Sequence, residues 1–206
     1  MATGAVLTAD IVNSTRLSAK EEKKLIDSLH AILSDYKFEF YRGDSFQVYL
    51  KDPSEVLKLA ICIRALAKKI DPVFDVRQSI GIGEIETPVR YLRHAKGEAF
   101  VLSGRTFDEL KENDRRLKIS SSSVTLNLGL EVLAEFTDMI FEQMTAKQAE
   151  VIVELLNDRT QVETAGKLKK SQGTINKHIQ SSGWRKIESI LDKFTQFVEI
   201  IEKPTP

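Results

Sequence analysis

The chain has 206 residues, and its 30 Lys and Arg balance its 30 Asp and Glu, so the formal net charge is zero. This balance excludes a uniformly polycationic protein. A composition of 42% hydrophobic and 29% charged residues also excludes a disordered or collagen-like chain. The length allows one large domain or two small ones.

Cys62 is the single cysteine, so no internal disulfide can form and a reducing compartment is expected. No apolar run approaches the roughly 18 residues of a membrane span, and the first residues lack the pattern of a signal peptide. We therefore expect a cytoplasmic protein without a membrane partner.

The first part of the chain alternates between strand and helix patterns. Strands are predicted where apolar and β-branched residues run together or alternate, and helices where apolar residues recur three or four positions apart. Ser18 and Glu21 form a capping-box pattern at the start of the first helix. In chain order we predict a strand over 5–12, a helix over 18–36, a hairpin over 37–51, a helix over 53–70, a strand over 74–86, a helix over 97–110 and a strand over 117–120. This order predicts an α+β fold whose first domain, residues 1–125, has a ferredoxin-like βαββαβ arrangement with an added helix and strand.

The rest of the chain is helical in pattern. A connecting helix is predicted within 126–144, and residues 145–206 predict an all-α helix-turn-helix domain that ends in a long amphipathic helix. The apolar residues of that last helix keep close to heptad spacing, which suits either packing within the domain or a dimer seam. Between Arg159 and Lys186 there are seven basic residues and one acid, Glu163, so a locally basic segment lies within a neutral chain.

Two acids of the first domain are candidate metal ligands. Asp10 lies near the end of the first strand and Asp44 lies in the hairpin turn, and these two strands are neighbours in the predicted topology. Two such carboxylates could share a Mg²⁺ ion together with substrate phosphates. Alternatively, both could be ordinary turn or cap residues. Arg42, in the same turn, could face a phosphate or simply be exposed.

Four segments in order resemble motifs of the class III nucleotide cyclases: ADIVNST, RGDSFQVYL, VRQSIGIGEI and GEAFVLSGRTFDEL. The resemblance covers about 110 residues. It implies that Asp10, Asp44 and the backbone of Ile11 bind Mg²⁺ or Mn²⁺ with a nucleoside triphosphate, and that Arg105 steadies the triphosphate. Three positions depart from the pattern, because Val101 replaces an asparagine, Phe40 replaces the purine-selecting lysine, and His94 replaces its acidic partner. Metal and phosphate binding are therefore expected to persist more readily than cyclisation.

The segment TQVETAGKLKKSQGTINKHI has a helix-turn-helix pattern and resembles the DNA-binding helices of response regulators and sigma-factor-like regulators. Ser171 is the predicted cap of the second helix, and Lys169 occupies a turn position where glycine is frequent. Side chains on the second helix can read bases or contact phosphate, and the lysines around it can contact phosphate. The predicted DNA-binding residues are Lys167, Lys169, Lys170, Ser171, Gln172, Thr174, Asn176, Lys177, His178 and Arg185.

The combination of a cyclase-like front and a helix-turn-helix back resembles the SatD family of small bacterial proteins. We expect a DNA-binding transcriptional regulator whose degenerate cyclase-like domain senses a nucleotide and a divalent metal. One alternative is an active nucleotidyl cyclase or phosphoryl-transfer enzyme with an accessory helix-turn-helix, and another is a protein-binding adaptor. The expected partners are double-stranded DNA and a second copy of the chain, since class III sites form between two subunits.

Overall fold

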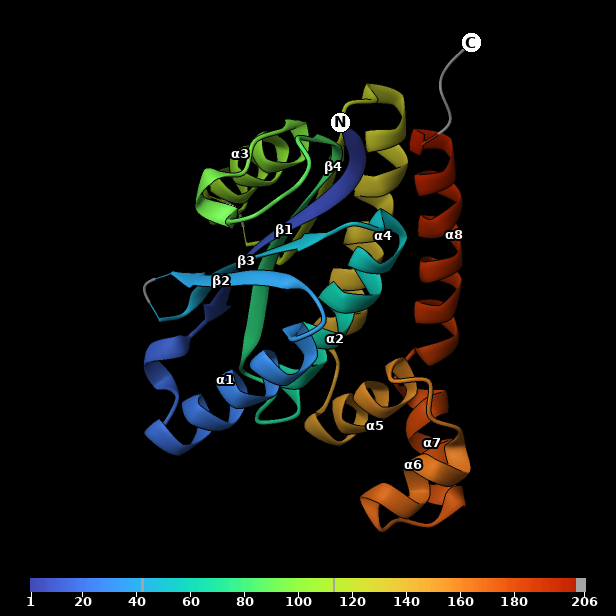
Figure 1. Ribbon diagram of the computed structural model, residues 1–206. Coiled ribbons are helices and arrows are strands. Elements are labelled where there is room, and N and C mark those ends of the chain that lie inside the picture. The colour runs from blue at the N-terminus through green and yellow to red at the C-terminus, as the bar shows by residue number, and fades with distance from the viewer. Residues whose placement is uncertain (42, 113, 203–206) are drawn as a thin grey trace.

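The computed structural model describes residues 1–41, 43–112 and 114–202, and it has a mixed α+β architecture (Figure 1). The strands are β1 (Ala2–Val12), β2 (Lys37–Tyr41), β3 (Ser45–Leu50), β4 (Asp75–Ile85) and β5 (Leu117–Ser121). The helices are α1 (Ala19–Leu33), α2 (Val56–Lys68), α3 (Glu98–Glu112), α4 (Val124–Glu142), α5 (Ala146–Leu156), α6 (Gln161–Leu168), α7 (Gln172–Ser181) and α8 (Trp184–Glu202). The predicted succession of strands and helices is therefore observed, with small differences in the bounds.

The strands form one sheet in the order β2-β3-β1-β4-β5. All neighbouring strands are antiparallel except β4 and β5, which are parallel. The central strand β1 pairs with β3 as far as Asp10 opposite Ser45, and with β4 as far as Val12 opposite Asp75. Asp10 consequently lies beside the start of β3 on one side and beside Arg77 of β4 on the other.

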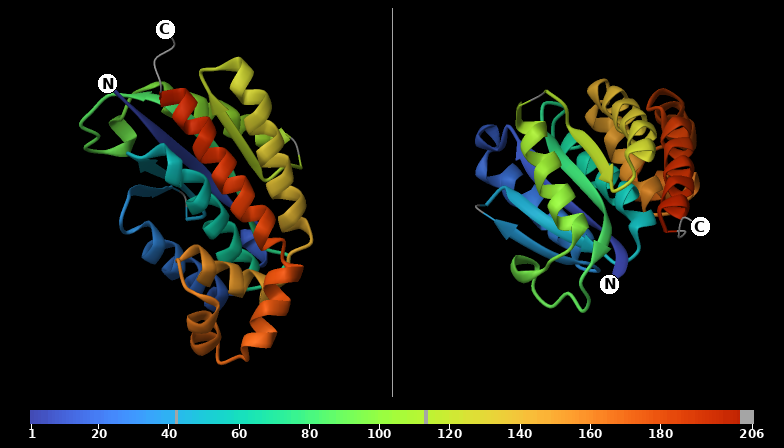
Figure 2. Two further views of the ribbon diagram at one scale, coloured as in Figure 1. Left: turned by 90° about the vertical axis from the view of Figure 1, so that its right-hand side faces the viewer. Right: turned by 90° about the horizontal axis from the view of Figure 1, so that it is seen from above.

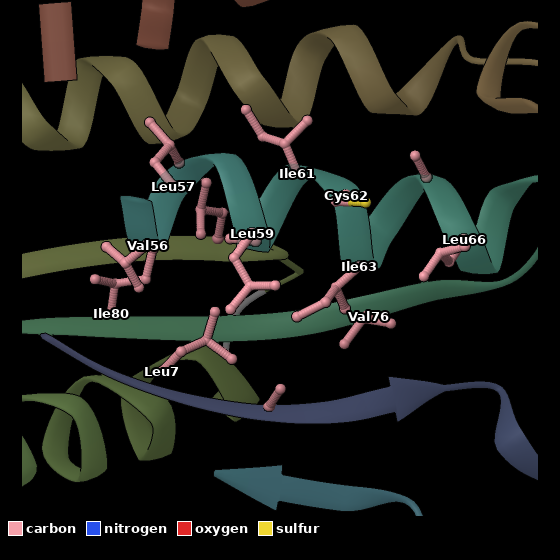
Figure 3. Close-up of a cluster of buried hydrophobic side chains, with 14 of the residues drawn as sticks. Leu7, Val56, Leu57, Leu59, Ile61, Cys62, Ile63, Leu66, Val76 and Ile80 are labelled. Carbon is pink, nitrogen blue, oxygen red and sulfur yellow. The ribbon is translucent and has the colours of Figure 1, made fainter. Parts of the chain in front are cut away.

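The two faces of the sheet carry different side chains because successive residues of a strand point to opposite sides. On one face, Leu7 of β1 and Ile80 of β4 pack against the apolar side of α2, which includes Leu59 and Ile63 (Figure 3). Helix α1 adds Leu25, Leu29 and Leu33 to the same core.

Helix α3 covers the opposite face of the sheet (Figure 1). It approaches β4 closely at Gly81, where an added Cβ would lie 2.2 Å from the carbonyl oxygen of Ala99 and 2.6 Å from the amide nitrogen of Ser103. Hydroxyl groups of Thr8, Ser79 and Ser103 exchange hydrogen bonds beneath the helix. The Gly-x-Gly pattern of β4 therefore serves the close packing of a helix on the strand.

The core continues beyond residue 125. One cluster of buried side chains joins the sheet and α2 to Leu130 of α4, Ile152 of α5 and Phe194 of α8. Helices α4 and α8 lie side by side (Figures 1 and 2), and at Gly129 they meet so closely that an added Cβ would be 2.4 Å from the ring of Phe197. Of the two uses considered for the apolar side of the last helix, the structure shows packing within the chain.

Helices α6 and α7 project from the end of the molecule, beyond α5 (Figure 1). They have a small core of their own, formed by Val151 and Leu155 of α5, Ala165 of α6, and Ile175 and Ile179 of α7. Trp184, at the start of α8, packs against both this cluster and the main core. The tryptophan therefore anchors the last helix.

Capping side chains define where two of the helices begin. Helix α4 begins at Val124, because the side chain of Ser123 accepts a hydrogen bond from the amide of Leu126. Helix α1 has the predicted capping box of Ser18 and Glu21 but ends at Leu33. None of the described helices is long and apolar enough to cross a membrane.

Candidate functional sites

The two predicted metal-binding acids lie at the same end of neighbouring strands. The amide of Ile11 donates a hydrogen bond to the backbone oxygen of Asp44 at 3.1 Å, which ties the end of β1 to the hairpin turn. The carboxylate of Asp44 accepts hydrogen bonds from the hydroxyl groups of Ser14, at 2.9 Å, and Ser45, at 3.3 Å. The serine of the ADIVNST segment therefore orients the acid of the following hairpin.

Asp10 lies in a half-buried environment beside a cation. Its Oδ2 is 3.5 Å from Nη1 of Arg77, whereas its Oδ1 is buried and has no hydrogen-bond partner. Burial raises the pKa of Asp10, and the charge of Asp44 adds to this rise, while Arg77, Lys111 and Arg116 oppose it. The structure thus places one unpartnered carboxylate oxygen and a group of cations near the two acids.

The other residues of the cyclase-like pattern lie in three different places. Arg105 and Val101 are exposed on α3. The cations that lower the pKa of Asp10 are Arg77, Lys111 and Arg116, so the arginine of the cyclase-like pattern is not one of them. The ring of Phe40 stacks on His30 with centroids 4.9 Å apart, and His94 is exposed. Arg42 lies outside the described residues.

Helices α6 and α7 are two short helices joined by a tight turn, and they lie where the sequence pattern predicted a helix-turn-helix. Thr160 and Glu163 make a capping box that starts α6, and the side chain of Ser171 caps α7 by accepting a hydrogen bond from Thr174. Between them Lys169 has a left-handed backbone, with φ 52° and ψ 45°. The turn is thus as sharp as one made with glycine, although a lysine occupies the position.

One side of α7 is buried and the other carries hydrogen-bonding side chains. Ile175 and Ile179 pack toward α5. Gln172, Asn176 and Lys177 are exposed, and Lys177 lies on the side of the helix opposite the two isoleucines. Asn176 also lines a hollow of about 540 Å³ that continues to Gln180 and, on α8, to Arg185 and Lys186. The structure therefore brings Asn176 and Arg185, which are nine positions apart, to one surface.

Two predicted phosphate contacts already have acidic partners. Lys167 lies 2.8 Å from Glu154, and Lys170 lies 2.5 Å from Glu150, both on α5. These acids precede the basic segment in sequence, so a charge count over 159–186 leaves them out. Within the described residues, Lys169, Lys177 and Arg185 are the predicted cationic contacts that make no ion pair within 4.0 Å.

Three further predicted DNA-binding residues contribute to the structure of the motif itself. Ser171 and Thr174 cap α7, and their hydroxyl oxygens are 2.9 Å apart. His178 is half-buried, and burial together with the charges of Lys170 and Lys147 lowers its pKa. Fewer side chains of α7 are therefore free to contact DNA than the sequence pattern predicted.

A third feature was not recognised in the sequence. A cavity of about 520 Å³ lies between the end of the sheet, α2 and α4, and the fully buried Arg64 forms part of its wall. Arg64 donates hydrogen bonds to Asp75 and Asp138, and its guanidinium carbon lies 4.5 Å from the centroid of the Phe141 ring. The one signal in the sequence was spacing, because Arg64 follows Leu57 by seven residues and Ile61 by three, and thus falls on the apolar side of its helix.

No family model matches the chain, and no curated protein matches it. Among solved structures, the chain is similar to a bacterial light-regulated adenylyl cyclase, with 12% sequence identity and a TM-score of 0.40. The similarity covers 58% of this chain and 76% of that one. A likeness of this size does not transfer an activity or a site residue.

Proposed function

We propose that the protein binds double-stranded DNA through α6 and α7 and acts as a transcriptional regulator. The observation that carries the proposal is that α7 buries Ile175 and Ile179 while its polar side chains Gln172, Asn176 and Lys177 stay exposed. A helix of this kind, preceded by a second helix and a sharp turn, fits the major groove with its polar side toward the bases.

The exposed side chains suit both parts of DNA recognition. Amide side chains such as those of Gln172 and Asn176 can pair with the two hydrogen-bonding groups of an adenine edge. Lys169, Lys177 and Arg185 are the cations free to neutralise phosphates, which makes affinity depend on salt. We also propose that the chain belongs to the SatD family and that β1 to β4, with α1 and α2, form a ferredoxin-like unit.

Fluorescence anisotropy with labelled duplex DNA tests this function. Affinity is expected to fall as salt rises, and Lys177→Glu should weaken binding and reduce the salt slope by more than the roughly one unit lost with a single phosphate contact. Lys20→Glu provides the matched control, because Lys20 is exposed on α1 and the charge change is equal. Equal losses in both variants, or binding that ignores salt, would contradict the proposal.

A base-reading role for Asn176 needs a separate comparison. Duplexes enriched by selection from a random pool should lose affinity for the Asn176→Ala variant by about 1–3 kcal/mol, while non-specific duplexes bind it nearly as well as before. If both classes of DNA lose affinity equally, Asn176 does not read a base.

A second candidate function is sensing of a divalent metal with a nucleotide in the first domain. The unpartnered Oδ1 of Asp10, next to Asp44, is the observation that favours it. Asp10, Asp44 and the backbone of Ile11 would hold the ion, which would supply positive charge for phosphate groups. Arg77 limits this fit, because its guanidinium already lies beside Asp10 and would repel a cation.

Thermal unfolding with Mg²⁺ or Mn²⁺ and a panel of nucleoside triphosphates tests this second function. Ligand at about 100 times its dissociation constant adds about 2.7 kcal/mol of stability. The shift should vanish in an Asp10→Asn, Asp44→Asn double variant and persist in an Asp27→Asn, Asp35→Asn control, whose acids are exposed on and after α1. A shift in wild type would then justify a product assay for cyclase or phosphoryl-transfer activity. No shift with any ligand would remove the candidate.

A further inference from the structure

Helix α4 carries an exposed ridge of large apolar side chains. Val124 is 81% exposed, Leu128 67%, Val132 49%, Phe136 51% and Met139 60%. The first four are spaced by four residues and so form one continuous row along the helix surface. The opposite side of α4 packs on β5 and α8, so this ridge is left over after the chain has formed its own core.

The ridge is large for a monomer surface. It extends from Val124 to Met139, and these 15 rises of about 1.5 Å correspond to about 22 Å of helix. Single exposed apolar residues are common, but a contiguous row of them marks an interaction surface. α4 contains no Lys, Arg or His, so no long basic side chain of the helix itself lies across the row.

Hollows lie on both sides of the C-terminal half of the ridge. Met139 lines the 520 Å³ cavity next to Arg64, and Phe136 and Met139 both line a second hollow of about 280 Å³ that continues to α7 and α8. The same surface therefore presents both a projecting row and depressions beside it. A face with both features can receive its own copy about a two-fold axis, since each contact then occurs twice.

Charges beside the ridge are also of both signs. Arg115 lies 3.1 Å from Glu131 and 3.5 Å from Glu135, and its Nη2 is buried without a hydrogen-bond partner. A second copy would bring a further set of the same acids toward this arginine. A row spaced by four residues can pack against an identical row with the helices crossing at about 50°.

We propose that the α4 ridge is the surface through which two copies of this chain form a homodimer, with Val132 near the two-fold axis. Val132 is the middle residue of the row, and residues near the middle of a self-complementary patch meet their own counterparts. A stable interface needs about 800 Å² from each partner, so the ridge and the walls of the neighbouring hollows must both take part. The proposal does not depend on DNA or nucleotide binding.

Sedimentation velocity of the full chain over a range of concentrations tests the proposal. Wild type is expected to shift from monomer to dimer, and Leu128→Lys and Phe136→Lys are expected to remain monomeric with unchanged far-UV circular dichroism. Val101→Lys is the matched control, because Val101 is also 58% exposed but lies on α3, and this variant should dimerise like wild type. A wild-type monomer at every concentration up to about 100 μM, or a dimer that survives both lysine variants, would overturn the proposal.

Cross-linking provides a readout that does not depend on variants with altered charge. Val132→Cys should form a disulfide-linked dimer on mild oxidation, whereas the native Cys62 is only 7% exposed and should not. The corresponding control, Val101→Cys, should stay monomeric. If the lysine variants fail to fold, cross-linking decides alone, and absence of a Val132→Cys dimer contradicts the interface.

Discussion

Arg64 and Asp75 form a buried, bidentate ion pair. Its Nε and Nη2 atoms lie 2.9 Å from the two carboxylate oxygens of Asp75, and its Nη1 lies 2.5 Å from Asp138. Asp138 in turn accepts hydrogen bonds from the amides of Arg116 and Leu117, at the start of β5. The network thus joins α2, β4, α4 and β5 at the end of the sheet where the chain turns toward its helical half.

Removing one partner of this network should be costly. Asp138→Asn should lower the free energy of unfolding by about 3–5 kcal/mol, because the buried cations Arg64 and Lys68 are then left with Asp75 as their shared counter-ion. Urea denaturation at neutral pH measures the loss. Lys58→Gln is the control, since the Lys58–Asp158 pair is exposed and its removal should cost at most about 1 kcal/mol. Equal losses in the two variants would show that the buried network stabilises the fold no more than an exposed ion pair does.

The same network predicts how stability depends on pH. Burial alone would raise the pKa of Asp75, but the charge and hydrogen bonds of Arg64 outweigh it and the pKa is lowered. A carboxyl with a lowered pKa in the folded state stabilises fully above its unfolded pKa of about 3.9, and this contribution is lost as the pH falls toward the folded value. Unfolding free energy should therefore drop below about pH 4, and less steeply in Asp75→Asn than in wild type.

Periodicity was sufficient to predict the elements of the fold, because apolar residues at spacings of two, three and four mark strands and helices directly. The expected pairing of β1 with the hairpin allowed Asp10 and Asp44 to approach each other, and the hydrogen bond from the Ile11 amide to the Asp44 backbone shows that these segments meet. The Arg64 network could not be predicted in this way. Asp138 is 74 residues from Arg64, and only the tertiary packing of α4 brings the two together.

The segment of α6 and α7 also separates local features, which the sequence predicted, from tertiary ones, which it did not. Caps and turn are local, so Ser171 and the left-handed Lys169 agree with the pattern. The partners of Lys167 and Lys170 come from α5, one turn apart on a helix that precedes the motif. Charge balance therefore had to be counted in space, where these two acids reduce the apparent excess of positive charge from six to four.

The contact between α3 and β4 predicts opposite effects for two glycines. Gly81→Ala should lower the free energy of unfolding by about 1–3 kcal/mol, because its Cβ would fall 2.2 Å from a backbone oxygen that cannot move aside easily. Gly104→Ala, on the open side of α3, should raise it by about 0.5–1 kcal/mol by favouring the helix. Thermal or urea unfolding of both variants gives the comparison. A loss at Gly104 as large as that at Gly81 would contradict the packing described.

The ionised carboxylate of Asp10 is expected to lower the free energy of unfolding. Its raised pKa means that the ionised carboxylate is less favourable in the folded chain than in the unfolded one. Asp10→Asn should therefore raise the melting temperature at pH 7, and its advantage should shrink as the pH falls and wild-type Asp10 becomes protonated. If Asp10→Asn is instead less stable at pH 7, the ion pair with Arg77 outweighs the cost of burial.

Lys169 separates the requirements of folding from those of DNA binding. The left-handed backbone of Lys169 costs a non-glycine residue about 1–2 kcal/mol. Glycine avoids this steric cost, but it loses more conformational entropy on folding, which cancels part of the gain. Lys169→Gly should therefore raise the free energy of unfolding by up to about 1 kcal/mol, and Lys169→Val should lower it, since β-branched residues tolerate this conformation least. If Lys169 contacts phosphate, the glycine variant should also bind DNA more weakly, with a salt slope reduced by about one unit. Unfolding and anisotropy measured on the same protein samples test both effects, and a more stable variant with unchanged affinity would assign Lys169 to the turn alone.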